Sequence, residues 1–292
     1  MCSRFLTSSP SRRLLARPRL GHHRETRGVP LPPFKIACHL IQFEGRENAE
    51  PEWVLNAVAE AGYEGCEGFG PKTPDELVQI ASLAGQYGLH IVNIGGPTPE
   101  ERVRFNVTLG NGAVEVPACG KASFGGPNPS DDDFAHAAAT LADAIAFAER
   151  HHLKPFHHAH IGTMIETEED ADRMLAAAPG LYLLLDTGHL TCAGSDALET
   201  LWAHKDRIGH VHLKDFTADD PSTWHWPGSK FWEEGRFSEL GDGNMGLDVP
   251  GVLKALGEVG YDGWVSVELD RASMDMAEAA KYNREYVRRL GY

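Results

Sequence analysis

The sequence has few cysteines, and none of the five belongs to a C-x-x-C pair. An odd number without such pairs argues against a disulfide framework and against a thiolate zinc site, and it fits a reducing compartment such as the cytoplasm. No apolar run reaches the roughly 18 residues that a membrane-spanning helix needs, so no membrane partner is expected. A G-x-G-x-x-G turn is also missing after the first apolar run, which disfavours an open dinucleotide-binding sheet.

Positive charge is scarce outside the N-terminus. The 292 residues carry a formal net charge of −15, yet residues 1–30 contain seven arginines against a single acid, Glu25, for a net charge of +6. The rest of the chain therefore carries −21. A body this acidic binds phosphate backbones poorly, so no nucleic-acid partner is expected and a metal-dependent endonuclease is disfavoured. The negative net charge favours a small neutral substrate, or an anionic substrate whose charge is neutralised by a cation in the binding site.

Residues 1–33 are expected to be a basic, disordered extension of a single domain that occupies residues 34–292. The extension is rich in Arg, Ser and Pro and ends in Val-Pro-Leu-Pro-Pro at 29–33. Organelle transit peptides share this composition, but no amphipathic stripe is present, so a disordered tail or an early start codon is preferred. Targeting to an organelle by this segment is the alternative to a cytoplasmic location.

From Phe34 onward, short apolar runs alternate with stretches typical of helices. The segments Thr73–Glu76 and Thr98–Glu101 each offer a capping Thr, a Pro at the first helical position and a Glu three residues after the cap. Helices are also expected at 131–152, 168–178 and 273–290, and strands at Lys35–Leu40, Gly65–Glu67, His90–Ile94, Ala113–Val116, Pro155–His160, Leu181–Asp186, Ile208–Leu213 and Trp264–Glu268. Eight strands alternating with helices predict an α/β fold of the (βα)₈ or TIM-barrel type.

Imidazole and carboxylate side chains are concentrated where the last four of these strands end. In a (βα)₈ barrel the catalytic groups lie at the carboxyl ends of the strands. Asp186 follows three leucines and Glu268 follows Val-Ser-Val, so an unpaired carboxylate at either place would be costly to bury. The other groups at these ends are His158, His160, His189, His212 and Lys214. This mixture of nitrogen and oxygen donors suits a divalent cation such as Mn²⁺, Co²⁺, Mg²⁺ or Zn²⁺.

Four segments carry a resemblance to known proteins: His158–Thr167, Leu183–Leu190, His210–Asp215 and Gly241–Gly243. They resemble the xylose-isomerase-like barrels of the sugar phosphate isomerase/epimerase superfamily. Within it the resemblance is closest to the inosose dehydratases, which remove water from 2-keto-myo-inositol. It is strong from about residue 131 to 270 and weaker before that.

The resemblance implies a metal site, with Mn²⁺ or Co²⁺ preferred to Mg²⁺ or Zn²⁺. The implied metal ligands are His158, Asp186, His212 and Glu268. Many members of the superfamily carry a glutamate where this sequence has His158. That difference argues against an epimerase mechanism in which two glutamates move protons, and inosose dehydratase-like sequences tend to carry histidines there.

A site of this kind suits removal of a proton next to a metal-polarised ketone, followed by protonation of a leaving hydroxyl or of the adjacent carbon. The candidate acids and bases are Glu268, His160, His189 and Lys214. The residues expected to contact the substrate are Glu67, His189, Lys214 and Trp226. Lys214 could instead pair with Asp215, and Glu67 could be solvent-exposed. Glu166 is expected to be ordinary charge at a helix start.

A long loop is expected from about 216 to 247, and it contains Trp224, Trp226 and Trp232. Long loops are often lids or binding elements, and aromatic rings stack on the apolar face of sugar rings. The loop is therefore interpreted as a substrate cover or as a subunit contact in a homo-oligomer. The alternative is an aromatic cluster that packs the loop onto the barrel.

The sequence thus predicts a metal-dependent lyase that acts on a keto-polyol or sugar, most like inosose dehydratase. A ketose 3-epimerase or an aldose–ketose isomerase shares the first proton abstraction and differs only in where the second proton goes. A non-catalytic carbohydrate-binding barrel is the remaining alternative.

Overall fold

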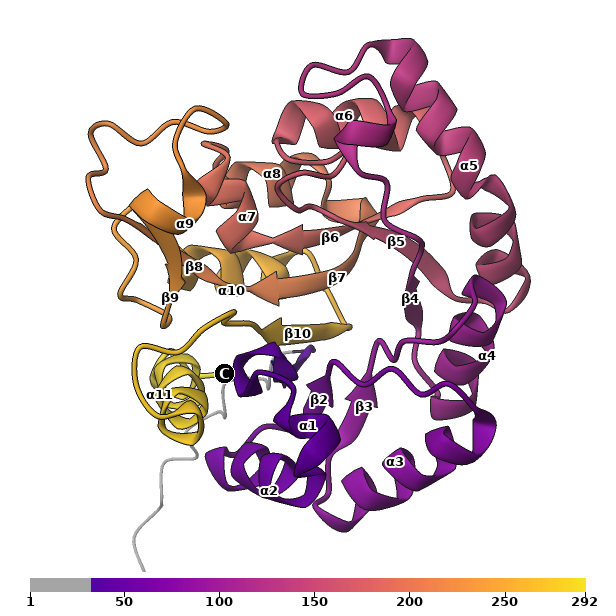
Figure 1. The fold of residues 1–292 in the computed structure, drawn as a ribbon, viewed down its shortest axis with the longest axis vertical. Helices are drawn as coiled ribbons and strands as arrows, with labels where there is room; N and C mark the ends of the chain where they lie inside the picture. The colour runs from indigo at the N-terminus through magenta and orange to yellow at the C-terminus, as the bar shows by residue number, and fades with distance from the viewer. Residues whose placement is uncertain (1–32) are drawn as a thin grey trace, which may run out of the picture. The chain divides into compact units, whose positions relative to one another are not determined.

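The computed structural model describes residues 33–292, so the predicted extension at 1–33 lies outside the described residues except for its last one. Eight parallel strands form one curled sheet in the order β3-β2-β1-β10-β7-β6-β5-β4 (Figure 1). The strands are β1 Lys35–His39, β2 Gly65–Glu67, β3 His90–Val92, β4 Ala113–Glu115, β5 Lys154–His158, β6 Tyr182–Asp186, β7 Ile208–Leu213 and β10 Trp264–Val267. Each predicted strand is present with its ends within two residues of the prediction, and the (βα)₈ barrel is confirmed.

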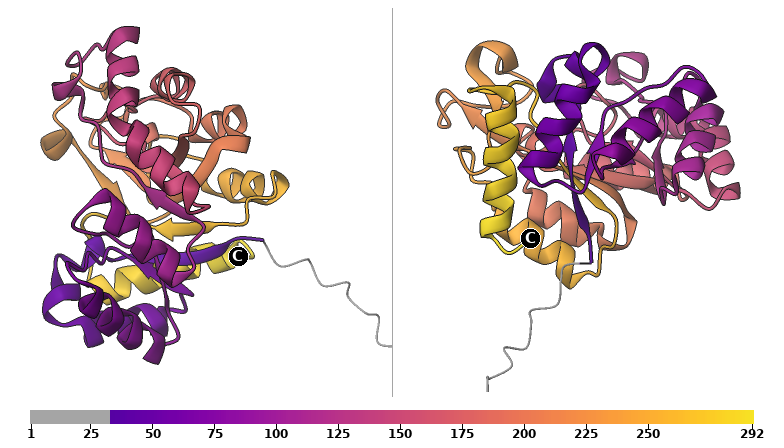
Figure 2. Two further views of the ribbon diagram at one scale, coloured as in Figure 1. Left: turned by 90° about the vertical axis from the view of Figure 1, so that its right-hand side faces the viewer. Right: turned by 90° about the horizontal axis from the view of Figure 1, so that it is seen from below.

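Helices connect the strands and lie outside the sheet (Figures 1 and 2). They are α1 Arg46–Ala49, α2 Pro51–Ala61, α3 Pro74–Gln86, α4 Pro99–Leu109, α5 Asp131–Arg150, α6 Glu168–Ala177, α7 Thr187–Cys192, α8 Ala197–Ala203, α9 Phe231–Glu234, α10 Val249–Glu258 and α11 Met276–Arg289. The predicted caps form, because Thr73 Oγ1 accepts a hydrogen bond from Glu76 N (3.1 Å) and Thr98 Oγ1 accepts one from Glu101 N (3.2 Å). Among the helices described, none has the length and apolar character needed to cross a membrane.

Alternation along β5 shows how the strands direct side chains toward the site. Phe156 stacks on His210 inside the barrel, with 5.3 Å between ring centroids, and His158 follows two residues later on the same face. His157 points the other way, where its Nε2 accepts a hydrogen bond from Cys119 N (3.1 Å). Burial lowers the pKa of His157 to about 4, so this side chain is neutral and structural.

The sheet has an open seam between β3 and β4, which side-chain amides bridge in place of a backbone ladder. Asn106 Oδ1 accepts from Ile94 N (3.1 Å) while its Nδ2 donates to Ile94 O (2.9 Å). Asn111 Nδ2 donates to the Asn106 oxygen (2.8 Å), and Glu115 N donates to Asn93 Oδ1 (3.2 Å). These amides satisfy backbone groups that would otherwise be buried without partners.

The predicted loop at 216–247 is wrong in part, because an antiparallel hairpin forms there from β8 (Asp215–Ala218) and β9 (Gly235–Ser238). Phe216 and Phe237 are buried in a small aromatic core, and Trp226 packs against it partly buried. Most of the aromatic side chains in this segment therefore pack the segment onto the barrel, which was the alternative to a substrate cover. Trp232 is the exception, since 76% of its surface is exposed.

Asp215 anchors the return of this segment to the barrel. Its Oδ2 accepts hydrogen bonds from Gly241 N (2.9 Å) and Gly243 N (3.1 Å). A Cβ atom at Gly243 would run into the Asp215 carboxylate, so a larger residue there would displace that carboxylate from its hydrogen bonds. The Gly-Asp-Gly sequence is thus a cradle for Asp215, and the alternative pairing of Asp215 with Lys214 is wrong.

Glu166 is not an ordinary surface charge at a helix start, and that prediction is wrong. It is buried, and its Oε2 accepts a hydrogen bond from Lys121 Nζ (2.8 Å), which also donates to Asp170 Oδ2 (2.9 Å). Gly162 N donates to the other Glu166 oxygen. This buried ion network fixes the loop that carries His160.

Candidate active site

Four side chains that could hold a metal ion meet at the carboxyl ends of β5, β6, β7 and β10. One ligand atom from each lies within 4.8 Å of the corresponding atoms of the others. The four residues are His158, Asp186, His212 and Glu268. This is the ligand set that the sequence resemblance implied, and the structure brings all four members together.

Two buried atoms in this group indicate that it fits a cation. Nδ1 of His212 and Oε2 of Glu268 face each other at close range, yet neither makes a hydrogen bond of acceptable geometry among the described residues. Burying polar atoms without partners costs free energy, and a cation between them removes that cost. Two imidazole nitrogens and two carboxylates form a donor set suited to a divalent transition metal.

Glu67, at the end of β2, sets the orientation of His212. Its Oε1 lies 3.2 Å from His212 Nε2 and accepts from Asn93 Nδ2 (2.7 Å), while its Oε2 lies 2.8 Å from His210 Nε2 and accepts from Ser266 Oγ. Burial alone would raise the pKa of Glu67, but the two histidines hold it well below the usual range. An ionised carboxylate only accepts, so His212 donates from Nε2 to Glu67, and Nδ1 is the nitrogen turned toward Glu268 and Asp186, where a metal would bind.

These hydrogen bonds give Glu67 a role other than the predicted contact with substrate. Its side chain is 2% exposed, which makes the solvent-exposed alternative wrong. Protein donors already occupy both carboxylate oxygens, so the geometry favours a positioning role over substrate binding.

Asp186 connects the four candidate metal ligands to helix α7. Its Oδ1 accepts from His189 N (2.8 Å) as the N-cap of α7, and its Oδ2 lies 3.1 Å from His158 Nε2. Burial alone would raise the pKa of Asp186, yet nearby His189 and Lys214 hold it well below the usual range. The carboxylate is therefore ionised and held at a fixed position.

Lys214 is fully buried beside this group and keeps its charge. Its Nζ donates to Glu268 Oε1 (3.0 Å) and to Asp270 Oδ1 (2.6 Å). Burial alone would lower the pKa of Lys214, but Glu268, Asp186 and Asp270 raise it above the usual range. A charged ammonium at this position can orient carboxylates and donate hydrogen bonds. Gly188 allows this arrangement, because a Cβ there would overlap the lysine stem.

His160 and His189 lie with their rings together, 3.7 Å between centroids. His160 Nδ1 lies 2.6 Å from the carbonyl oxygen of Ile161, so Nδ1 carries the proton and Nε2 holds a lone pair. Burial and the neighbouring His158 lower the pKa of His160, which keeps the ring neutral. His160 lines the cavity, whereas His189 is 1% exposed and lies behind it.

The cavity at this mouth of the barrel has a volume of about 430 Å³, within the usual range of small-molecule sites. Residues of the metal group line it together with Glu67 and His160. Arg102 and Glu115 also line it as an ion pair (3.2 Å), so this wall offers both donors and acceptors to substrate hydroxyls. Trp226 is not among the described lining residues and packs with the hairpin core, so its predicted role as a substrate contact lacks support from its position.

His39, at the end of β1, was missed by the sequence reasoning. Its Nδ1 accepts from Ile41 N (3.2 Å), and its ring lies 5.3 Å from that of His212. A neutral imidazole with Nδ1 accepting carries its proton on Nε2, so His39 is a donor that lines the cavity. The strand-end rule that identified His158 also applies to the first strand and could have found it.

The chain belongs to the xylose isomerase-like TIM barrel family, whose model matches residues 55–290. The superfamily resemblance found in the sequence is thereby confirmed. An inosose dehydratase of Clostridium perfringens is 32% identical over 160 residues, which cover 51% of this chain and 53% of that protein. One from Bacillus licheniformis is 36% identical over 150 residues, which cover 49% of each chain. The chain thus spans about half the length of the curated relatives it matches.

The fold is also shared with a D-allulose 3-epimerase from Methylomonas sp. The TM-score is 0.65 at 18% identity, with 89% of this chain and 99% of that chain covered.

Proposed function

We propose that this protein is a metal-dependent lyase that removes water from a keto-cyclitol or keto-sugar, most like an inosose dehydratase. The observation that carries the proposal is the convergence of His158, Asp186, His212 and Glu268 beside a neutral imidazole, that of His160, at the mouth of the barrel. The similarity to inosose dehydratases over half the chain supports the same substrate class. Small neutral polyols also agree with the acidic charge of the domain.

The metal would be held by His158 Nε2, His212 Nδ1 and one carboxylate oxygen each from Asp186 and Glu268. When bound, it supplies a Lewis acid that polarises the ketone of the substrate. Mn²⁺ or Co²⁺ is proposed, because the site mixes imidazole and carboxylate donors.

His160 is proposed as the group that moves the proton. Its Nε2 lone pair takes the proton next to the ketone, and the resulting imidazolium can return it to the leaving hydroxyl. Lys214 holds Glu268 and Asp270 in place, and His39 donates a hydrogen bond to a substrate oxygen. His189 supports the ring of His160 from behind.

Epimerisation at the same site is the second candidate, since ketose 3-epimerases share the fold. It needs a second base that acts on the opposite face of the substrate carbon. Glu268 is a poor candidate, because one oxygen is held by Lys214 and the other faces His212. Dehydration through His160 is therefore favoured.

A cytoplasmic location is also proposed, supported by four described cysteines that are all free thiols.

Turnover of 2-keto-myo-inositol by the purified chain tests the proposal. With Mn²⁺ or Co²⁺ present we expect water loss, detected as the unsaturated or dicarbonyl product, and no change in D-allulose or D-fructose. Chelation with EDTA should abolish the reaction, and added metal should restore it. Epimerised ketose without dehydration would establish the second candidate, and turnover that is unaffected by chelation would contradict the metal mechanism.

His160→Asn should lower kcat by about 10²- to 10⁴-fold, the usual contribution of general acid–base catalysis. The amide keeps a donor toward the Ile161 oxygen but lacks the Nε2 lone pair. Steady-state kinetics and metal titration together provide the check, because metal affinity should stay near the wild-type value. His136→Asn, an exposed change on α5, is the matched control. Equal kcat for His160→Asn and the control would remove His160 from the mechanism.

A further inference from the structure

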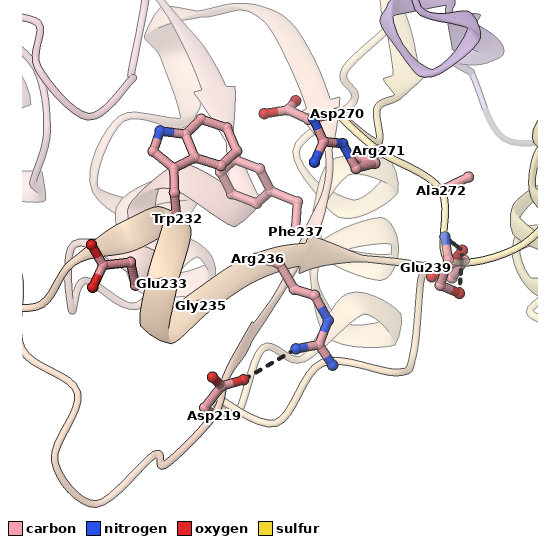
Figure 3. Close-up of a pocket in the computed structure, with 11 residues that line it drawn as sticks. Asp219, Trp232, Glu233, Gly235, Arg236, Phe237, Glu239, Asp270, Arg271 and Ala272 are labelled. Atoms are coloured by element: carbon pink, nitrogen blue, oxygen red, sulfur yellow. Dashed lines mark hydrogen bonds and ion pairs between the residues drawn. The ribbon is translucent and has the colours of Figure 1, made fainter.

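A second cleft, with a volume of about 290 Å³ (Figure 3), shares the lining residue Asp270 with the active-site cavity. Trp232 and Phe237, from α9 and β9, form one side of it. Asp270, Arg271 and Ser273, from the segment after β10, form the other. The proposed reaction uses no part of this cleft except Asp270.

Phe237, which lines the cleft, also contacts two residues of the candidate active site. The Phe237 ring lies 3.8 Å from Lys214 Nζ and 4.6 Å from the His189 ring, measured to ring centroids. Asp270 lines both spaces and accepts a hydrogen bond from Lys214 Nζ (2.6 Å). Asp270 is thus a wall that the two spaces share, and a substituent on a ring bound in the cavity would have to pass this residue to enter the cleft.

The chemistry of the lining points to a carbohydrate ring. Trp232 presents a largely exposed indole at the edge of the cleft, an apolar face of the kind that marks binding sites. Hydrogen-bonding groups line the same cleft: Glu239 accepts from Ser273 N (2.8 Å), and Arg236 pairs with Asp219 (3.2 Å, Figure 3). An aromatic face with flanking carboxylates and guanidinium groups matches the C–H face and hydroxyls of a sugar.

The charge of the lining disfavours an anionic group such as a phosphate. Two guanidinium groups, those of Arg236 and Arg271, face an excess of carboxylates. The carboxylates are Asp219, Glu233, Glu239 and Asp270. A neutral, hydroxyl-rich substituent therefore fits better than a phosphate.

We propose that this cleft binds a second sugar ring, so that the preferred substrate is a glycoside of a keto-sugar or keto-cyclitol. The inference rests on the proposed function for the chemistry at the first ring. The glycosidic bond is not cleaved: the proton and the hydroxyl leave the ring in the cavity, and the second ring supplies binding energy only.

The test measures dissociation constants in the presence of Mn²⁺ by calorimetry or ligand-observed NMR. The probes are myo-inositol and its galactoside, α-D-galactosyl-myo-inositol, neither of which carries a ketone that can react. We expect the galactoside to bind about tenfold more tightly, as one stacked ring with hydrogen bonds provides. In Trp232→Ala this ratio should fall to near one. Trp202→Ala removes another exposed tryptophan, on α8, and should keep the wild-type ratio.

Three results would overturn the proposal: equal affinities in the wild-type protein, a ratio that Trp232→Ala leaves unchanged, or tighter binding of myo-inositol 1-phosphate than of the galactoside. These outcomes do not depend on turnover. Dehydration of 2-keto-myo-inositol without a galactoside preference would remove the second-ring site alone. A Trp232-dependent preference without any dehydration would leave the site and remove the proposed reaction.

Discussion

Asp186→Asn should lower kcat/KM for the dehydration by at least about 10³-fold and remove measurable binding of Mn²⁺ or Co²⁺. The amide preserves the size of the side chain and one oxygen that can cap α7 at His189 N. It removes the negative charge that helps hold a dication between His158 and His212. Kinetics and isothermal calorimetry measure the two effects separately.

Thermal unfolding gives a further readout of the same change. A metal at about 100 times its Kd stabilises the native protein by about 2.7 kcal/mol, which raises the Tm by several degrees. Asp186→Asn should lose this shift while keeping a cooperative transition. The matched control is Asp196→Asn, which alters the exposed N-cap of α8 in the same way and should retain both the shift and activity. A full metal-induced shift in Asp186→Asn would mean that the cation lies elsewhere.

The strands of the barrel and the candidate ligands at their ends were predictable from the sequence, because both depend on local patterns. Short apolar runs located the strands, Thr-Pro-x-Glu caps located the starts of α3 and α4, and the strand ends in such a barrel share one rim. Asp186 and Glu268 were identified because each follows a fully buried run, where an unpaired carboxylate is costly.

Features that depend on contacts between distant segments were not predictable. The β8–β9 hairpin is set by Asp215, whose partners Gly241 and Gly243 lie 26 and 28 residues away. Glu166 looked like a helix-start charge because its partner, Lys121, is 45 residues distant. No periodicity or capping signal encodes such a pair.

Glu67 is the strongest example of this limit, because its partners come from elements across the barrel and its role follows only from their geometry. Glu67→Gln should weaken metal binding by about 10- to 100-fold, as expected for a residue that orients a ligand. In either orientation the amide nitrogen would face an imidazole N–H, that of His212 or that of His210. The substitution therefore breaks the network that fixes the His212 ring with Nδ1 turned toward the metal site. Calorimetric titration with Mn²⁺ measures this loss.

The same substitution should lower the free energy of unfolding of the metal-free protein by about 3 kcal/mol, because it breaks a buried charged hydrogen-bond network. Urea unfolding followed by circular dichroism gives this value. Glu64→Gln changes an exposed glutamate three residues earlier and should leave metal affinity and stability within experimental error of the wild type. Loss of stability with unchanged metal affinity would show that Glu67 only holds the barrel together. Loss of both is the result that makes Glu67 the residue that keeps His212 Nδ1 turned toward the metal site.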